Sequence, residues 1–294
     1  MAIRMDGKEV ASFHRDRIGR SVAAFTEKTG HRPTLAVVLV GDDPASVSYV
    51  TSKKAACEEV GIAHRDWHLP SDTSQEELLD LVAELNGNAE VDGILVQFPT
   101  PPQIDDERIM LAIAPEKDVD GLNPVNAGLT LMGRDSLVSC TPKGILAILD
   151  YYRIETDGRR VCVIGRSNLV GKPIASLLMQ RGRDATVTVC NTHTRNLSSI
   201  TLESDIIIVA AGHPHTLTAD MVKEGAVVID VGTNRVEDSS RERGWRLVGD
   251  ADYATVRLKA SHITPVPGGV GPMTITMLMD NTLIAAERRA GVTA

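Results

Sequence analysis

The sequence predicts an α/β protein with two α/β domains that flank a cleft, the second of them built on a doubly wound parallel sheet. Its 294 residues are enough for two domains that each bury a core. Short apolar runs rich in valine and isoleucine alternate with helical patterns along the chain, which is typical of parallel sheets covered by helices. A glycine-rich turn at 161–173, VCVIGRSNLVGKP, follows one of the predicted strands.

Six apolar runs are expected to form buried strands, because each is short and rich in β-branched residues. They are residues 34–40, 93–96, 160–164, 186–190, 205–209 and 226–231. Since helical patterns lie between them, we expect the strands to pair in parallel.

Two helix starts are marked by their residue types. Ser74, with Glu77 three residues later, forms a capping box. Thr141 before Pro142 provides an N-cap with proline at the first helical position. We expect the helix over 142–152 to begin the second domain.

The domain boundaries follow from these signals. We expect a first domain over 1–139, completed by 273–294, and a second over 140–272. The final apolar helical run near the C-terminus is expected to return to the first domain. The proline-rich stretch 98–133 is predicted to be a long irregular loop, and long ordered loops are usually functional.

Composition and charge exclude several classes of protein. The net charge of −8 and the absence of a Lys/Arg cluster argue against nucleic acid as a partner. No apolar run is long enough to span a membrane. Four scattered cysteines without a CxxC pair, and an N-terminus without a signal peptide, indicate a cytoplasmic protein. No spacing of histidines or carboxylates predicts a metal site.

The turn at 161–173 places glycines between a buried strand and a helix, where backbone N–H groups and the helix dipole favour a phosphate. By itself, a glycine-rich turn between a strand and a helix is only a tight connection about as often as it is a nucleotide-binding site. It is not GxGxxG. It also differs from a P-loop, because the Gly165 to Gly171 spacing is one residue too long and Pro173 stands where a magnesium-binding hydroxyl would be needed. A P-loop ATPase or ligase is therefore disfavoured.

A second turn, CNTHTRN at 190–196, indicates which dinucleotide the domain binds. In a doubly wound domain this turn meets the adenosine ribose, and a 2′-phosphate there needs hydroxyl and cationic donors. Thr192 and Arg195, together with Arg166 from the first turn, provide such donors. The sequence therefore favours NADP over NAD.

The helical segment 47–62 places Tyr49 and Lys53 at i and i+4, on one face. A solvated lysine beside a half-buried tyrosine is the commoner meaning of that spacing. Gln97 at a strand end and Asp120 in a glycine-proline loop are polar groups of the kind found in α/β active sites. Near an amide, a desolvated lysine can have its pKa lowered towards neutrality. Because an acid would oppose this, we expect Asp120 to hold substrate rather than lie against the amine.

Taken together, these residues resemble the bifunctional methylenetetrahydrofolate dehydrogenase/methenyltetrahydrofolate cyclohydrolase family. The resemblance covers essentially the whole chain, with short motifs in the family's order and spacing. The matching segments are SYVTSKKAACEEVGI, DGILVQFPTPP, PEKDVDGLNPVNAG, CTPKGIL, VIGRSNLVGKP, AVVIDVGTN and ITPVPGGVGPMTITML.

The resemblance implies roles for four residues of the first domain. Lys53 would transfer protons, and Tyr49 would stack on the folate and orient the lysine. Gln97 would tune Lys53 by hydrogen bonding, and Asp120 would bind the pterin.

The resemblance also implies a cofactor site on a Rossmann-like second domain and a loop that closes over folate. The cofactor residues would be Gly165, Arg166, Ser167, Thr192 and Thr233, with Arg195 added by the spacing above, and the loop residues Pro267, Gly268 and Gly269. Three positions depart from the family's usual residues: Phe98 for leucine, Thr192 for serine and Thr233 for isoleucine. The threonine at 192 keeps the hydroxyl.

The function implied is oxidation of 5,10-methylenetetrahydrofolate with NADP to the methenyl compound, followed by hydrolysis to 10-formyltetrahydrofolate. This would be an enzyme of one-carbon metabolism and purine biosynthesis, and a homodimer is expected. Two alternatives stay open: a monofunctional member of the family, and a catalytically inactive dinucleotide-binding protein.

Overall fold

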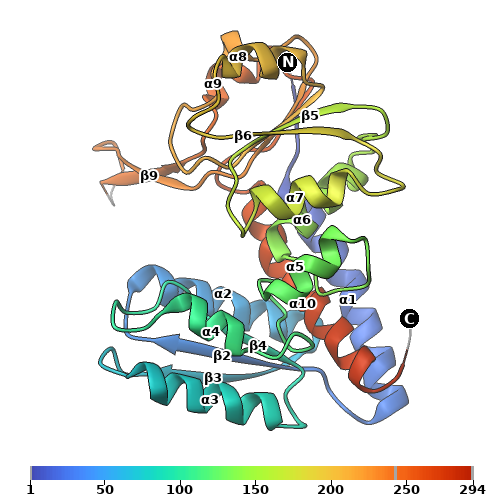
Figure 1. Ribbon diagram of the computed structural model, residues 1–294, viewed down its shortest axis with the longest axis vertical. Coiled ribbons are helices and arrows are strands. Elements are labelled where there is room, and N and C mark those ends of the chain that lie inside the picture. Colours follow the sequence, from blue (N-terminus) through green and yellow to red (C-terminus); the bar gives the residue numbers. More distant parts are fainter. Residues whose placement is uncertain (1, 242–243, 293–294) are drawn as a thin grey trace. The chain divides into compact units, whose positions relative to one another are not determined.

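The computed structural model describes residues 2–241 and 244–292, and the chain divides into two compact units (Figure 1). One unit contains the chain up to Ala11 and Thr141–Thr274. The other contains Ser12–Cys140 and the chain from Ile275 onwards. Each unit has a parallel sheet of its own.

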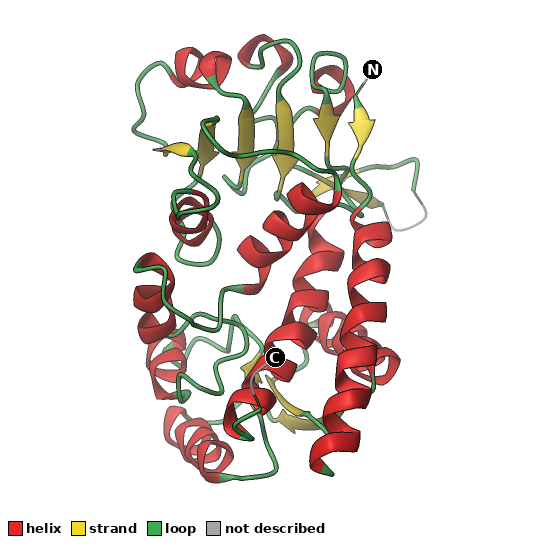
Figure 2. Ribbon diagram, turned by 90° about the vertical axis from the view of Figure 1, so that its right-hand side faces the viewer, coloured by secondary structure: helices red, strands yellow, loops and turns green. Residues whose placement is uncertain are grey.

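The unit around Thr141–Thr274 contains a six-stranded, all-parallel sheet in the order β1-β11-β8-β7-β5-β6. Its strands are β1 (Ile3–Arg4), β5 (Arg160–Ile164), β6 (Thr186–Cys190), β7 (Ile206–Val209), β8 (Val227–Asp230) and β11 (His262–Ile263). Figure 2 draws them side by side in yellow. The order runs outwards from β5 in both directions, which is the doubly wound arrangement.

Helices and a hairpin complete this unit. They are α6 (Cys140–Tyr151), α7 (Gly171–Leu178), α8 (Leu197–Glu203), the 3₁₀ turn η1 (Ala219–Met221), α9 (Tyr253–Val256) and the antiparallel pair β9 (Asn234–Glu237) and β10 (Trp245–Val248). Apolar side chains from alternate positions of the central strands form its core.

The second unit contains a three-stranded parallel sheet in the order β3-β2-β4. Its strands are β2 (Thr34–Val40), β3 (Ala63–Leu69) and β4 (Gly93–Val96), and its helices include α2 (Pro44–Val60), α3 (Gln75–Gly87), α4 (Asp106–Ala112) and α5 (Pro124–Leu131). The long helices α1 (Gly7–Thr29) and α10 (Val270–Arg289) begin in the first unit and continue in this one. Alternate residues of β2 and β4 pack against α3 and α4.

All six predicted strands are present, with 205–209 and 226–231 shortened at their ends. The capping box is confirmed, because Ser74 Oγ accepts from the Glu77 N–H and the Glu77 carboxylate accepts from the Ser74 N–H at 2.8 Å. The helix expected from residue 142 instead begins at Cys140. Thr141 therefore lies inside the helix, where its hydroxyl is 2.9 Å from that of Thr274.

Other expectations need correction. The stretch 98–133 is not wholly irregular, since it contains α4 and α5. The N-terminal residues group with the six-stranded sheet rather than with the residues that follow them, because β1 pairs in parallel with β11. The chain from Ile275 does group with the other unit. Within the described residues, every helix is too short or too polar to span a bilayer.

Candidate active site

Lys53 on α2 and Gln97 at the end of β4 are brought together by the fold. The Lys53 Nζ donates a hydrogen bond to Gln97 Oε1 at 2.7 Å. The other end of the amide, Gln97 Nε2, donates to the Phe98 carbonyl at 2.9 Å, so the amide oxygen is turned towards the amine. Tyr49 lies one turn before Lys53 on α2 and is 51% exposed.

Asp120 and Cys140 lie close to the same amine. Burial lowers the pKa of Lys53, and the charges of Asp120 and Cys140 oppose that change. Burial also raises the pKa of Asp120, against the effects of the Lys53 charge and a hydrogen bond from Cys140. Asp120 was expected to stay away from the amine, yet it is the strongest charge acting on Lys53. The lowered pKa therefore reflects burial outweighing a nearby carboxylate.

Asn281, on α10, binds the two backbone segments that carry Asp120 and Cys140. Its fully buried Nδ2 donates to the carbonyl oxygens of Val119 and Val138, both at 2.8 Å. The Cys140 N–H donates to the Asp120 carbonyl at 3.3 Å. One side-chain amide thus fixes the segments that lead into Asp120 and Cys140, which positions the carboxylate and the thiol.

The turn that carries Asp120 is organised by a second carboxylate. Asp118 is 3% exposed and accepts hydrogen bonds from the Leu122 N–H, the Asn123 N–H and Asn126 Nδ2, at 3.2, 2.8 and 2.9 Å. Burial raises the pKa of Asp118 to about 6, against the effect of these three donors. Asp118 therefore shapes the loop, whereas Asp120 lies beside Lys53.

Three of these residues were missed from the sequence. Cys140 is one of the four scattered cysteines, to which the sequence gives no role at a site; it is buried, and its thiol donates to the Asp120 carboxylate. Asp118 lies in the same glycine-proline loop as Asp120, and no sequence pattern gives it a role of its own. Asn281 lies in an apolar helical run, and a polar side chain at such a position needs buried partners, which is the signal that could have identified it.

The first cofactor turn is shaped by two glycines. Gly165, at the end of β5, has φ +126°, and a Cβ there would overlap the Ala210 carbonyl oxygen. A Cβ at Gly171, where α7 begins, would overlap the Gly165 carbonyl. Ser167 Oγ accepts from the Val170 N–H at 3.1 Å and tightens the turn. Bare backbone before a helix N-terminus fits the phosphates of a dinucleotide.

The second cofactor turn is brought beside the first by strand pairing. β5 and β6 are parallel neighbours with Ile164 opposite Cys190, so the segments that follow them leave the sheet together. Arg166 in the first turn, and Thr192 and Arg195 in the second, are all exposed. The hydroxyl and the two guanidinium groups are therefore available to a 2′-phosphate.

Thr233 and the loop after β11 lie at the same edge of the sheet. Thr233 is exposed and follows β8, which lies two strands from β5 in the parallel sheet. In the loop, Gly268 has φ +99° and its carbonyl accepts from the Gly7 N–H at 2.9 Å. Pro267 is exposed and Gly269 is buried. These loop residues belong to a different unit from Lys53.

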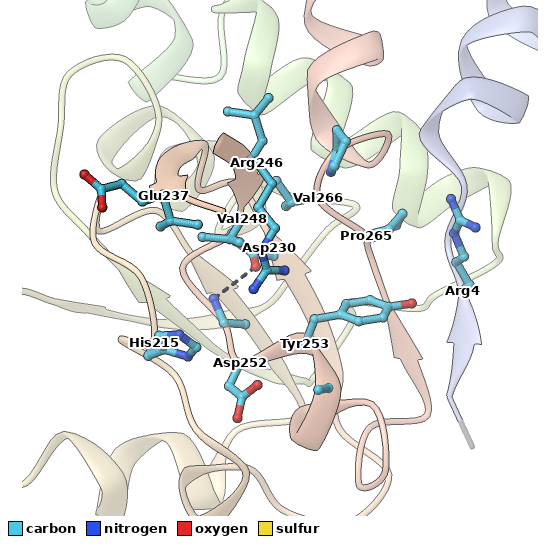
Figure 3. Close-up of a pocket in the computed structure, with 16 residues that line it drawn as sticks. Arg4, His215, Asp230, Glu237, Arg246, Val248, Asp252, Tyr253, Pro265 and Val266 are labelled. Carbon is cyan, nitrogen blue, oxygen red and sulfur yellow. Dashed lines mark hydrogen bonds between the residues drawn. The ribbon is translucent and has the colours of Figure 1, made fainter. Parts of the chain in front are cut away.

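A cavity of about 690 Å³ lies beside this loop, within the same unit (Figure 3). Pro265, Val266 and Pro267 line it, together with Tyr253 and the buried carboxylate of Asp230. Asp230 therefore lies at the wall of a cavity next to the loop expected to close over folate.

The four cysteines are buried and form no disulfide bond, and Cys162 and Cys190 have their sulfur atoms 3.7 Å apart across β5 and β6. Among residues 2–241 and 244–292, no group of three or more histidines, cysteines or carboxylates is arranged to hold a metal ion.

Comparison with known proteins identifies both halves of the chain. Residues 5–120 match the family described as Tetrahydrofolate dehydrogenase/cyclohydrolase, catalytic domain, and residues 139–290 match its NAD(P)-binding domain. The protein named Bifunctional protein FolD from Chlorobium chlorochromatii is 50% identical over 294 residues, which covers 99% of this chain and 100% of the relative.

Two solved structures are similar over their whole length. The bifunctional FolD enzyme from Campylobacter jejuni has a TM-score of 0.92 at 44% identity, covering 98% of this chain and 100% of that one. The FolD enzyme from Trypanosoma brucei, complexed with NADP cofactor and inhibitor, has a TM-score of 0.92 at 39% identity, covering 100% and 99%. This chain belongs to the tetrahydrofolate dehydrogenase/cyclohydrolase family.

Proposed function

We propose that this protein oxidises 5,10-methylenetetrahydrofolate with NADP to 5,10-methenyltetrahydrofolate and then hydrolyses that product to 10-formyltetrahydrofolate. The observation that carries the proposal is the Lys53 amine, held at 2.7 Å by Gln97 with its pKa lowered by burial. An amine of this kind can exchange protons near neutral pH. Family membership supports both activities in one chain.

Lys53 would serve the hydrolytic step. Water forms a bond to the methenyl carbon and passes a proton to the neutral amine. The new hydroxyl then loses its proton to solvent as the formyl C=O forms and the ring C–N bond breaks. The ammonium returns its proton to the departing nitrogen, so the lysine ends as it began and one proton is released overall. Gln97 accepts from the amine in both protonation states, which keeps Nζ in place throughout.

Asp120 and Tyr49 would bind and orient the substrate. The Asp120 carboxylate can accept hydrogen bonds from the pterin amine and amide groups, and the Cys140 thiol holds it in position. The exposed ring of Tyr49, on the same helix as Lys53, offers a flat apolar surface for the pterin and aminobenzoate rings.

NADP, when bound, accepts the hydride from the methylene carbon. Its phosphates would bind the bare backbone around Gly165, a position where a side chain would overlap the neighbouring backbone. Arg166, Thr192 and Arg195 would donate to its 2′-phosphate. Thr233 would lie beside the nicotinamide, with Gly268 and Gly269 in the loop over the folate. These groups position the reactants, which is what hydride transfer chiefly needs.

We further propose that the enzyme acts in the cytoplasm as a homodimer, as part of the one-carbon supply for purine biosynthesis. The four buried free thiols agree with a reducing compartment. A closed two-fold dimer is the commonest symmetric assembly.

A spectrophotometric assay tests the proposal directly. Purified protein is mixed with methylenetetrahydrofolate and either NADP or NAD, and formation and decay of the methenyl compound are followed. We expect methenyl formation with NADP and faster decay than without protein. Formation without accelerated decay would leave only a dehydrogenase, and the absence of both would refute the proposal.

A further inference from the structure

Asp250, fully buried behind the edge of the six-stranded sheet, ties together loops that come from different strands. Its Oδ2 accepts from the N–H groups of Ala211 and Gly212, at 2.6 and 2.8 Å, just after β7. Its Oδ1 accepts from Asn234 Nδ2 at 2.7 Å, at the start of β9. Three neutral donors from two loops thus converge on one carboxylate.

Asp230, at the end of β8, continues the same network. Its carboxylate accepts from the N–H groups of Gly232, Asp250 and Ala251, at 3.0, 2.9 and 3.0 Å, the last drawn as the dashed line in Figure 3. Its own N–H donates to Thr264 Oγ1 at 2.7 Å, directly before the proline-glycine loop. The two carboxylates therefore connect the segments after β7, β8 and β10, and the backbone N–H of Asp230 adds the segment after β11.

Glycines leave room for this network. A Cβ at Gly232 would overlap the Asp250 carboxylate, and a Cβ at Gly249 would overlap the Asp230 carboxylate. The backbone at these two glycines therefore approaches the acids too closely to allow a side chain there.

Thr233 stands between the two anchored positions. The preceding Gly232 is held by Asp230, and the side chain of the following Asn234 is held by Asp250. Thr233 itself is exposed at the sheet edge. Asp250 also holds the segment that begins at Ala211. The preceding residue, Ala210, packs on Gly165. The carboxylates therefore set the position of Thr233 relative to the turn at Gly165.

Two adjacent buried carboxylates are a costly way to hold loops together. Burial, together with the charge of Asp250, raises the pKa of Asp230 to about 6, against the opposing effect of the three N–H donors. Each acid accepts three N–H groups, which a carboxylate can do with both oxygens whereas a neutral amide has only one acceptor oxygen. The presence of carboxylates at these two positions is therefore explained by the three N–H groups that each must hold in place.

We propose that Asp250 is a positioning residue for hydride transfer, which fixes Thr233 and the loop after β7 so that the nicotinamide is held in the orientation that hydride transfer needs. The inference rests on the proposed function and on the place of Thr233 beside the nicotinamide. It predicts that loss of the hydrogen bonds made by the side chain at position 250 affects the dehydrogenase step far more than the cyclohydrolase step.

The test compares Asp250→Ala with Asp250→Asn and with Asp205→Ala. Asn at 250 can keep the Ala211 and Gly212 bonds and still pair with Asn234 after that amide rotates. Asp205, at the opposite end of β7, accepts from the Arg160 N–H and pairs with Lys223, so its loss removes hydrogen bonds that lie away from the loops. For each variant, thermal unfolding, the kcat and NADP KM of the dehydrogenase, and cyclohydrolase turnover of supplied methenyl substrate are measured.

We expect Asp250→Ala to lower dehydrogenase kcat by about 10²-fold, the cost of a misplacement of about 1 Å. The KM for NADP should change by less than about threefold, because the phosphate turns follow β5 and β6. Cyclohydrolase turnover should stay within about twofold, Asp250→Asn should recover most of the kcat, and Asp205→Ala should lower the unfolding temperature while keeping kcat.

Equal loss of both activities in Asp250→Ala, or an unchanged dehydrogenase kcat, would overturn the inference. If that variant does not fold, Asn234→Ala removes only the side-chain bond to Asp250, and an unchanged kcat there overturns it equally. The unmodified protein is assayed first. A lack of dehydrogenase activity in it contradicts the proposed function and is thereby distinguished from a failure of the Asp250 variants alone.

Discussion

The amide oxygen of Gln97 lies 2.7 Å from the amine of Lys53, although the two residues are 44 positions apart in the chain. The amide cannot turn freely, because its nitrogen is engaged by the Phe98 carbonyl. Gln97 therefore presents an acceptor that carries no charge. Such an acceptor holds the amine without stabilising its protonated form as strongly as a carboxylate would.

Replacing Gln97 by Glu places a carboxylate at that position and raises the pKa of Lys53. Because the hydrolytic step begins with the neutral amine, cyclohydrolase activity should shift to higher pH by about one unit or more. The measurement is the initial rate of methenyl loss across a pH series, corrected for the reaction without enzyme. A pH profile identical to that of the unmodified protein would mean that Gln97 does not tune the amine.

Replacing Arg166 by Ala tests the assignment of the 2′-phosphate. Loss of one charge-assisted contact should raise the KM for NADP by about tenfold or more, at about 1.5–3 kcal/mol per such bond. The KM for NAD should stay nearly constant. Arg181→Ala is the matched control, since Arg181 is equally exposed but follows the C-terminal end of α7. An unchanged preference for NADP over NAD in Arg166→Ala contradicts the assignment.

Asp118 predicts how stability depends on pH. Its pKa is about 6 in the folded protein, above the value of about 3.9 expected when unfolded. Because its pKa is higher in the folded protein, Asp118 binds a proton more tightly there, and protonation of Asp118 stabilises the folded state. This contribution to the free energy of unfolding, up to about 3 kcal/mol, is fully present below about pH 4 and is lost as the pH rises through about 6.

Asp118→Asn should therefore flatten the fall in unfolding free energy between about pH 4 and about pH 7. Urea unfolding at a series of pH values measures this. Part of the slope should remain, because burial also raises the pKa of Asp230 to about 6. The same slope in the variant and the unmodified protein would show that Asp118 does not titrate in this range.

Strands that are buried on both faces could be located from the sequence, because an unbroken run such as TLAVVLV in β2 is too apolar for a loop and too short for a typical buried helix. β3 could not. Its residues, AHRDWHL, are half-buried or exposed at the edge of the sheet, so they carry no apolar pattern. β1 and β11 are two residues each and are defined by their mutual pairing.

The candidate site could be predicted residue by residue but not as an arrangement. Lys53, Gln97 and Asp120 could each be singled out from local context or from the family resemblance. The Asn281 amide that holds the segment before Asp120 comes from a helix 162 positions from its Val119 partner. Contacts over such separations depend on how the whole unit packs, which helix spacing and turn chemistry do not encode.

The central claim is that Lys53 carries the proton transfers of the hydrolytic step. The most direct measurement is cyclohydrolase turnover of Lys53→Met beside Lys54→Met, which removes an exposed amine from the next position of the same helix. We expect Lys53→Met to lose about 10²- to 10⁴-fold in turnover while still binding NADP, and Lys54→Met to stay within about twofold. Full cyclohydrolase turnover by Lys53→Met would contradict the account.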